Sequence, residues 1–251
     1  DIWAKTMNDV VNYQNDEHDK LNEEDVHIPS DEIEVPEELL PSKEILEEAK
    51  KHTNIEDIIL DEKNKTVYIK DKDLIMDLGS VAKGYATELV GKTLEEAGLD
   101  SAIISAGGNV RTIGKTKRNN AAHWAIGIAH PRSDEINDTI DTLFVDETSV
   151  VTSGDYQRYF MANGKRYHHI IDPETAYPPE LFTSVTIVTN DSGLADYLST
   201  VLFLVDEKTG KEIISQYDED IEVLWVDQDN NISYTDGLKD KMLSQRADNE
   251  K

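Results

Sequence analysis

Short β-rich runs separated by turn residues recur along the chain after residue 55, and they constrain its fold more than any other feature. Several runs flank turn signals, such as residues 61–65 and 162–165, an arrangement typical of β-hairpins. Segments 81–97 and 194–205 instead space their apolar residues as helices do, and Gly98 is placed to end the first of them. This mixed order predicts an α+β fold with a mostly antiparallel sheet and packed helices. The expected strands lie at residues 58–60, 66–69, 74–78, 101–105, 124–129, 139–145, 156–160, 166–171, 184–189, 221–226 and 232–234.

The first 50 residues differ in composition from the rest of the chain. They are rich in acidic residues, and three prolines interrupt any long element. Residues 15–25 are nearly all polar and predict a solvated loop or the edge of a helix, whereas Ser42 predicts the N-cap of a helix ending near residue 51. We therefore expect an acidic N-terminal segment at 1–50 as the remnant of a longer region, a domain at 51–240, and a disordered tail at 241–251.

The charge balance excludes several classes of function. Acidic residues outnumber basic ones by 52 to 25, which gives a net charge of -27. Phosphate backbones and anionic lipids are bound by clustered Lys and Arg, so neither nucleic acid nor an anionic membrane surface is expected as a partner. The chain has no Cys, which excludes disulfides, thiolate metal sites and Cys nucleophiles. No apolar run approaches the roughly 20 residues of a transmembrane helix.

Residues 76–85 predict a strand, a Gly79-Ser80 turn and the start of a helix. A helix N-terminus presents unpaired N–H groups and the positive end of the helix dipole, which suits a phosphate group. Lys83 in the first turn would add a cation, and the glycines permit close approach of a ligand. An ordinary strand-to-helix turn with Lys83 on the surface remains an equal alternative, because the pattern matches neither common nucleotide-binding loop.

Two further small-residue clusters follow expected strands. Gly107 and Gly108, before Asn109, permit an unusual backbone path or a ligand close to the main chain. Residues 152–154 combine two hydroxyls and a glycine between strands and could bind phosphate or ribose. A tight turn is the better explanation of each cluster when the cluster is taken by itself.

Two other groups offer catalytic or metal-binding atoms. His168 and His169 are adjacent on an expected strand, so they face opposite sides and only one can line a given site. A histidine titrates near neutral pH and can act as a general base. Asp196 and Thr200 are four residues apart on an expected helix, so both oxygens share one face and could bind magnesium. A surface histidine and an exposed Asp–Thr pair are the alternatives.

The order of these groups resembles the FAD:protein FMN transferases, the ApbE-like flavin transferases with a T-fold-related architecture. The resemblance covers roughly residues 40–235. It rests on DLGSVAKGY at 77–85, AGGN at 106–109, TSGDY at 152–156, HIIDP at 169–173, SVT at 184–186 and ADYLST at 195–200. In that family FAD is cleaved at its pyrophosphate, AMP leaves, and FMN becomes linked through a phosphoester to a threonine of a target protein that carries a flavinylation motif.

The resemblance also implies roles for individual residues. The magnesium ligands would be the side chains of Asp196 and Thr200 and the main-chain carbonyl of Ala82. His169, Lys83 and Asp172 would act in catalysis, with His169 or Asp172 as the base. The implied FAD-binding residues are Gly79, Ser80, Lys83, Gly107, Gly108, Asn109, Thr152, Ser153, Gly154 and Ile170.

The chain departs from the family in two respects. Relatives usually carry a further N-terminal segment with flavin-contacting residues, and we expect this chain to start just after that segment, near Ile2-Trp3. The family also usually has Gly where Ala176 stands, and a positive φ there would strain the backbone by roughly 1 kcal/mol. A non-catalytic flavin-binding protein is therefore one alternative, and hydrolysis of FAD to FMN and AMP is another.

The family is typically exported and often lipid-anchored. The resemblance therefore implies an extracytoplasmic location, with any lipid anchor lost from this chain.

Overall fold

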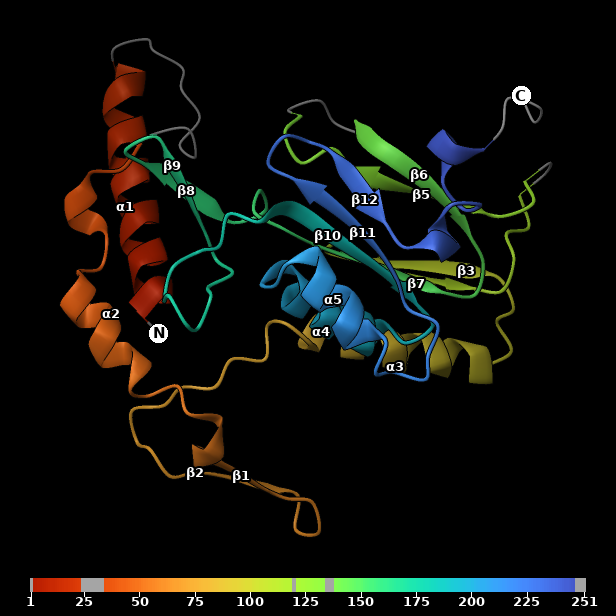
Figure 1. Ribbon diagram of the computed structural model, residues 1–251, viewed down its shortest axis with the longest axis horizontal. Coiled ribbons are helices and arrows are strands. Elements are labelled where there is room, and N and C mark those ends of the chain that lie inside the picture. Colours follow the sequence, from red (N-terminus) through yellow and green to blue (C-terminus); the bar gives the residue numbers. More distant parts are fainter. Residues whose placement is uncertain (1, 24–33, 119–120, 134–137, 247–251) are drawn as a thin grey trace. The chain divides into compact units, whose positions relative to one another are not determined.

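The computed structural model describes residues 2–23, 34–118, 121–133 and 138–246 (Figure 1). The chain forms two compact units, one of residues 1–77 and 157–179 and one of residues 78–156 and 180–251. This division differs from the expected boundary at residue 50. The first unit extends past residue 50 to include a hairpin of residues 58–69, and it also includes a second hairpin of residues 159–168 from the middle of the chain.

The first unit combines two helices with two separate β-hairpins. Helix α1 (Ile2–Glu23) and helix α2 (Lys43–Lys50) come first, with short 3₁₀ turns at Glu37–Leu39 and Ile55–Asp57. Strands β1 (Ile58–Asp61) and β2 (Thr66–Ile69) form one hairpin, and β8 (Tyr159–Ala162) and β9 (Lys165–His168) form the other. The core of this unit consists of Trp3, Val10, Val35, Leu46, Phe160, Ala162 and Ala176.

The second unit is built on a six-stranded sheet in which every neighbouring pair is antiparallel. Its order is β12 (Ile232–Tyr234), β11 (Glu222–Asp227), β10 (Phe182–Thr189), β7 (Ser149–Gly154), β4 (Asn109–Ile113) and β3 (Ala102–Ala106). Helices α3 (Ala82–Glu96), α4 (Ser192–Phe203) and α5 (Glu207–Ile214) lie along one side of the sheet (Figure 1). The hairpin of β5 (Trp124–Ala129) and β6 (Thr139–Val145) lies along the other (Figure 1). The expected α+β fold with a mostly antiparallel sheet is confirmed.

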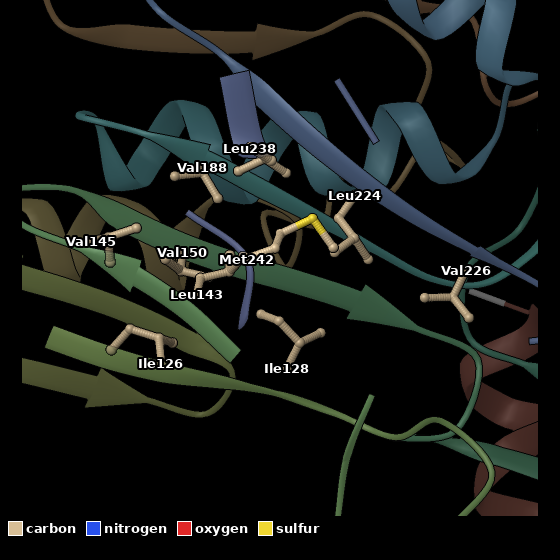
Figure 2. Packing of buried hydrophobic residues seen from close by; sticks show 10 residues of the cluster. All are labelled: Ile126, Ile128, Leu143, Val145, Val150, Val188, Leu224, Val226, Leu238 and Met242. Carbon is tan, nitrogen blue, oxygen red and sulfur yellow. The ribbon is translucent and has the colours of Figure 1, made fainter. Parts of the chain in front are cut away.

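A hydrophobic cluster joins the β5–β6 hairpin to the sheet. Figure 2 shows Ile126 and Leu143 of the hairpin near Val150 of the sheet, with Met242 among them. Met242 is only 1% exposed, and Phe144 N–H donates to the Lys241 carbonyl. The expectation of a disordered tail from residue 241 is therefore wrong for residues 241–246, because Met242 fills the core. Residues 247–251 lie outside the described part.

Most expected elements form, and some bounds shift. The Ser42 hydroxyl caps α2 by accepting from Ile45 N–H, and Gly98 follows the C-cap of α3 with φ +89°, as predicted. Helix α1 runs through residue 23, so the polar stretch expected as a loop or helix edge is helical up to that point. The remainder of that stretch lies outside the described residues.

Other strand predictions are wrong in detail. Residues 74–78 form no strand, and the strand expected at 101–105 is the half-exposed edge strand β3 rather than a buried one. Residues 152–154 lie at the end of β7 and not between strands. None of the described helices combines the length and apolar character needed to cross a bilayer.

Candidate functional site

Helices α3 and α4 are in close contact at Gly84. A Cβ atom at this position would lie 2.2 Å from the Ser192 carbonyl oxygen and 2.5 Å from Asp196 Cβ. Only a residue without a side chain lets the two helix backbones meet this closely. The contact places the first turn of α3, which contains Ala82 and Lys83, against the Asp196 turn of α4.

The Asp196 carboxylate occupies this junction and is 3% exposed. Its Oδ2 atom accepts a hydrogen bond of 2.8 Å from Gly84 N–H, and its Oδ1 atom lies 3.6 Å from Lys83 Nζ. Lys83 Nζ also donates to the Gly79 carbonyl at 3.4 Å, so it connects the predicted phosphate loop to the carboxylate. A buried carboxylate is stable only with such compensating charge and donors. The junction therefore contains a carboxylate and an ammonium group, which an ordinary apolar helix crossing lacks.

A chain of hydroxyls continues from Asp196 toward the sheet. Ser199 Oγ donates to the Asp196 carbonyl at 2.8 Å and lies 2.7 Å from Ser153 Oγ on β7. Ser153 Oγ in turn lies 3.5 Å from Thr200 Oγ1. Predicted site residues from the 152–154 cluster and from α4 therefore meet in the folded chain.

Thr152 points to the opposite face of the sheet. Its hydroxyl oxygen lies 2.8 Å from that of Thr186 on β10. Because successive side chains of a strand alternate between faces, Thr152 and Ser153 cannot line the same pocket through their side chains. A role of Thr152 at the α4 side would have to use its main chain.

The Gly107-Gly108 turn connects β3 to β4 and lies close to Lys83. Both glycines have positive φ, +54° and +93°. A Cβ atom at Gly107 would have Lys83 Cδ 3.9 Å away. Asn109 follows this turn with 1% exposure, and its Nδ2 has no hydrogen-bond partner among the described residues. The turn therefore brings open backbone close to the lysine, and a buried amide donor follows it.

The donor set at the α3–α4 junction fits magnesium. A carboxylate, the Thr200 hydroxyl and a main-chain carbonyl at Ala82 are hard oxygen ligands, which magnesium prefers. The carboxylate is already buried and held by a main-chain donor, so it would lose little freedom on binding a cation. Ser80 and Gly154 belong to the same unit, and their predicted contacts with FAD stay predictions.

The remaining predicted site residues belong to the first unit. His169 is exposed, and the Arg158 carbonyl oxygen accepts from its main-chain N–H at 3.2 Å and from Nδ1 at 3.3 Å. In the neutral imidazole, this contact favours the tautomer with the proton on Nδ1 and the lone pair on Nε2, the form needed for a general base. His168 is buried, and β9 ends at this residue, so His169 lies beyond the strand on which both histidines were expected.

Asp172 closes a tight turn just beyond His169. Its Oδ1 accepts from Glu174 N–H at 2.8 Å, and its carbonyl accepts from Ala176 N–H at 2.8 Å. Ala176 has φ +62°, so the position does require the left-handed conformation that the glycine usual in the family suggested. Ile170 is buried, with its N–H bonded to His168, so only its carbonyl and side chain could meet a ligand.

Sequence reasoning missed two participants. Ser199 connects Asp196 to β7 through two hydrogen bonds. Its spacing of three residues from Asp196 puts it on the same helix face, and this spacing is the signal that could have identified it. Gly84 sets the helix approach, but one glycine within a helix gives no indication of which neighbour it will meet.

A second group of possible metal ligands lies in the first unit. Ligand atoms of His52, Asp71 and Asp73 lie within 4.8 Å of one another. The Asp71 carboxylate, 2.7 Å from His52, raises the pKa of that histidine. The N–H of Asp73 and the His52 ring lower the pKa of Asp71, and Lys72 pairs with Asp73. These carboxylates already have partners, and the group contains no residue of the motif series.

Comparison with known proteins supports one family. The sequence model of the ApbE family matches residues 20–225. A FAD:protein FMN transferase of Klebsiella pneumoniae is 36% identical over 181 residues, covering 72% of this chain and 54% of that protein. One of Treponema pallidum is 30% identical over 184 residues, covering 70% of this chain and 50% of that protein. The chain spans about half the length of the curated relatives it matches.

Solved structures agree with this result. The ApbE protein of Thermotoga maritima superposes with a TM-score of 0.72 and 35% identity, covering 83% of this chain and 65% of that chain. The flavin transferase ApbE of Vibrio cholerae gives a TM-score of 0.66 and 25% identity, covering 80% of this chain and 63% of that chain.

Proposed function

Because this chain belongs to the ApbE family, we propose that it transfers FMN from FAD to a threonine of a target protein in a magnesium-dependent reaction that releases AMP. The relatives named FAD:protein FMN transferase support the reaction. The metal and the threonine acceptor come from the resemblance of the motif series.

The observation that carries the proposal is the buried Asp196 carboxylate between Gly84 N–H and Lys83 Nζ. Packing alone does not explain a carboxylate at a helix crossing, because a small apolar side chain would fill the same space with a smaller desolvation cost. Together with Thr200 and Ser153, it forms an oxygen-rich site beside a lysine and an open glycine turn. This is the combination that a diphosphate and its cation require.

Asp196, Thr200 and the Ala82 carbonyl would hold the magnesium ion. When bound, the ion would neutralise charge on the diphosphate oxygens. Lys83 would add a second positive charge at the same group, and the Gly107-Gly108 turn would let the phosphates approach the main chain.

The transfer step is a displacement at phosphorus. The hydroxyl oxygen of the target threonine forms a bond to the FMN phosphorus, while the bond from that phosphorus to the bridging oxygen breaks. AMP leaves with the bridging oxygen and the bonding electron pair. Nε2 of His169 accepts the hydroxyl proton, in the tautomer that the Arg158 carbonyl favours. Asp172, whose carboxylate caps a turn, would support the position of this loop.

Two alternatives use the same residues. In hydrolysis, water would replace the threonine and FMN would be released. In a non-catalytic flavin-binding protein, FAD would bind without cleavage. By the usual location of the family we also propose an extracytoplasmic site of action, which cell fractionation tests.

The deciding experiment incubates the chain with FAD and magnesium, with and without a protein that carries a flavinylation-motif threonine. AMP release together with an FMN-sized mass gain on the target supports transfer. AMP without the mass gain supports hydrolysis. FAD binding without AMP supports the non-catalytic alternative, and it rejects the proposed function for this chain.

A further inference from the structure

The buried histidine of the His168-His169 pair has no part in the reaction described above. His168 is 4% exposed and is the last residue of β9, directly before the proposed base. A buried imidazole that only filled space could be replaced by an apolar ring, which would avoid the cost of burying polar nitrogens. Both ring nitrogens of His168 instead make specific hydrogen bonds.

The two hydrogen bonds require one tautomer. Nε2 lies 3.0 Å from the Pro179 carbonyl oxygen, which can only accept, so Nε2 carries the proton. Nδ1 therefore holds a lone pair, and it accepts from Ile170 N–H at 3.3 Å. The Pro179 carbonyl thus makes Nδ1 the acceptor that the next turn needs.

These contacts lie at the two ends of one loop. Ile170 directly follows His169, and Pro179 ends the same stretch of the first unit. Between them, residues 172–177 form the Asp172 turn, which includes the strained Ala176. The His168 ring therefore joins the beginning of the loop to its end, and it holds the peptide group that follows His169.

We propose that His168 is a positioning residue: its Nδ1 atom fixes the Ile170 peptide and thereby the direction in which His169 presents its imidazole. This inference rests on the proposed function, in which His169 acts as the base. The Arg158 carbonyl holds the peptide and ring of His169 from one side, and His168 holds the following peptide from the other.

Two isosteric substitutions separate the two hydrogen bonds. In His168→Asn, the amide oxygen takes the place of Nδ1 and can accept from Ile170 N–H without the Pro179 contact. In His168→Gln, the amide nitrogen takes the place of Nε2 and can donate to Pro179 O, but Ile170 N–H loses its acceptor. We expect His168→Gln to lower kcat for AMP release by about 10- to 100-fold, because small displacements of a catalytic group have effects of this size. The KM for FAD should stay unchanged, and His168→Asn should retain most of kcat.

The measurements are steady-state AMP release, hydrogen exchange of the Ile170 amide and urea unfolding of each variant. His123→Gln is the matched control, because His123 pairs with Asp146 in the second unit and its replacement should leave kcat unchanged. Equal kcat values in the Asn and Gln variants, or a loss that follows stability alone, would overturn the inference.

If His168→Gln does not fold, His168→Asn decides. A protected Ile170 amide with normal kcat supports the inference, and a protected amide with low kcat overturns it. An unmodified chain that binds FAD but releases no AMP overturns the proposed function, and this inference with it. An active chain that fails the comparison of variants overturns only the inference.

Discussion

The α3–α4 junction and the loop of residues 168–179 both hold candidate catalytic groups, but different forces hold them. At the junction, two helix backbones meet across Gly84 with no room for a methyl group, and the carboxylate of Asp196 is enclosed by that packing. In the loop, the hydrogen bond from Ile170 N–H to His168 and those from His169 to the Arg158 carbonyl set the position of an exposed His169.

This difference predicts how each region can be damaged. Closely packed helices are destabilised by added side-chain volume, because neighbouring backbones cannot move independently. A loop held by hydrogen bonds is destabilised by the loss of one donor or acceptor, because the remaining polar group is left without a partner. The proposed metal ligand Asp196 thus lies in a closely packed helix contact of the second unit, whereas the proposed base depends on a few polar contacts.

The largest effect is expected for Asp196→Asn. The amide oxygen can still accept from Gly84 N–H, so the junction should stay folded while the negative charge is lost. We expect AMP release to fall by at least about 100-fold, as for removal of a key electrostatic group. Calorimetric titration with magnesium should show weakened binding. An unchanged magnesium dependence of the reaction would remove Asp196 from the metal site.

His169→Ala tests the loop directly. Loss of the general base should slow AMP release by about 10²- to 10⁴-fold. FAD binding, followed by the quenching of flavin fluorescence, should be largely kept, because the ligand set on α4 is untouched. A variant that reacts at the normal rate would show that another group accepts the proton.

Gly84→Ala tests whether volume governs the junction. The added methyl would collide with Ser192 O and Asp196 Cβ, and we expect the free energy of unfolding to fall by about 1–3 kcal/mol. Urea unfolding measures this change. Gly210→Ala is the control, since the added Cβ would meet only side-chain atoms, the nearest at 3.3 Å. Similar stability of the two variants would contradict the packing argument.

Substitutions at Ala176 test the strain in the loop. In Ala176→Gly, relief of about 1–2 kcal/mol from the left-handed conformation is opposed by the greater freedom of unfolded glycine and the loss of a buried methyl. The net change in unfolding free energy should therefore stay below about 1 kcal/mol. Ala176→Val should destabilise clearly, because a β-branched side chain disfavours positive φ. A tolerated valine, measured by urea unfolding, would show that the loop can adopt another conformation.

The smallest effect concerns the ion pair of His52 and Asp71, which also stabilises a loop region through polar contacts. The raised His52 pKa means that its contribution is complete below pH 6.5 and is lost as pH rises through the raised value. The lowered Asp71 pKa means that its contribution is present above pH 3.8 and is lost as pH falls through the lowered value. Asp71→Asn should lower the His52 pKa, as followed by NMR titration; an unchanged value would exclude this pair as its cause.

Much of the local structure follows from residue order alone. The alternation of strands and turns predicted the hairpins β1–β2 and β8–β9, because neighbouring segments with a tight turn have few other ways to pair. Helix spacing placed Asp196 and Thr200 on one face, and the order of motifs indicated the family. These features depend on contacts between residues close in sequence.

Contacts between residues far apart in the sequence could not be predicted from such local patterns. Ser153 faces α4 while Thr152 faces β10, and this choice depends on the register of β7 in the sheet. Met242 packs in the hydrophobic cluster with residues of the β5–β6 hairpin, although its polar surroundings in the sequence suggested a tail. The sequence by itself determined which chemical groups are present and how they are spaced along each element. The burial of each group, the face of the sheet or helix on which it lies and its hydrogen-bond partner were decided by tertiary packing. These properties depend on elements that are far apart along the chain.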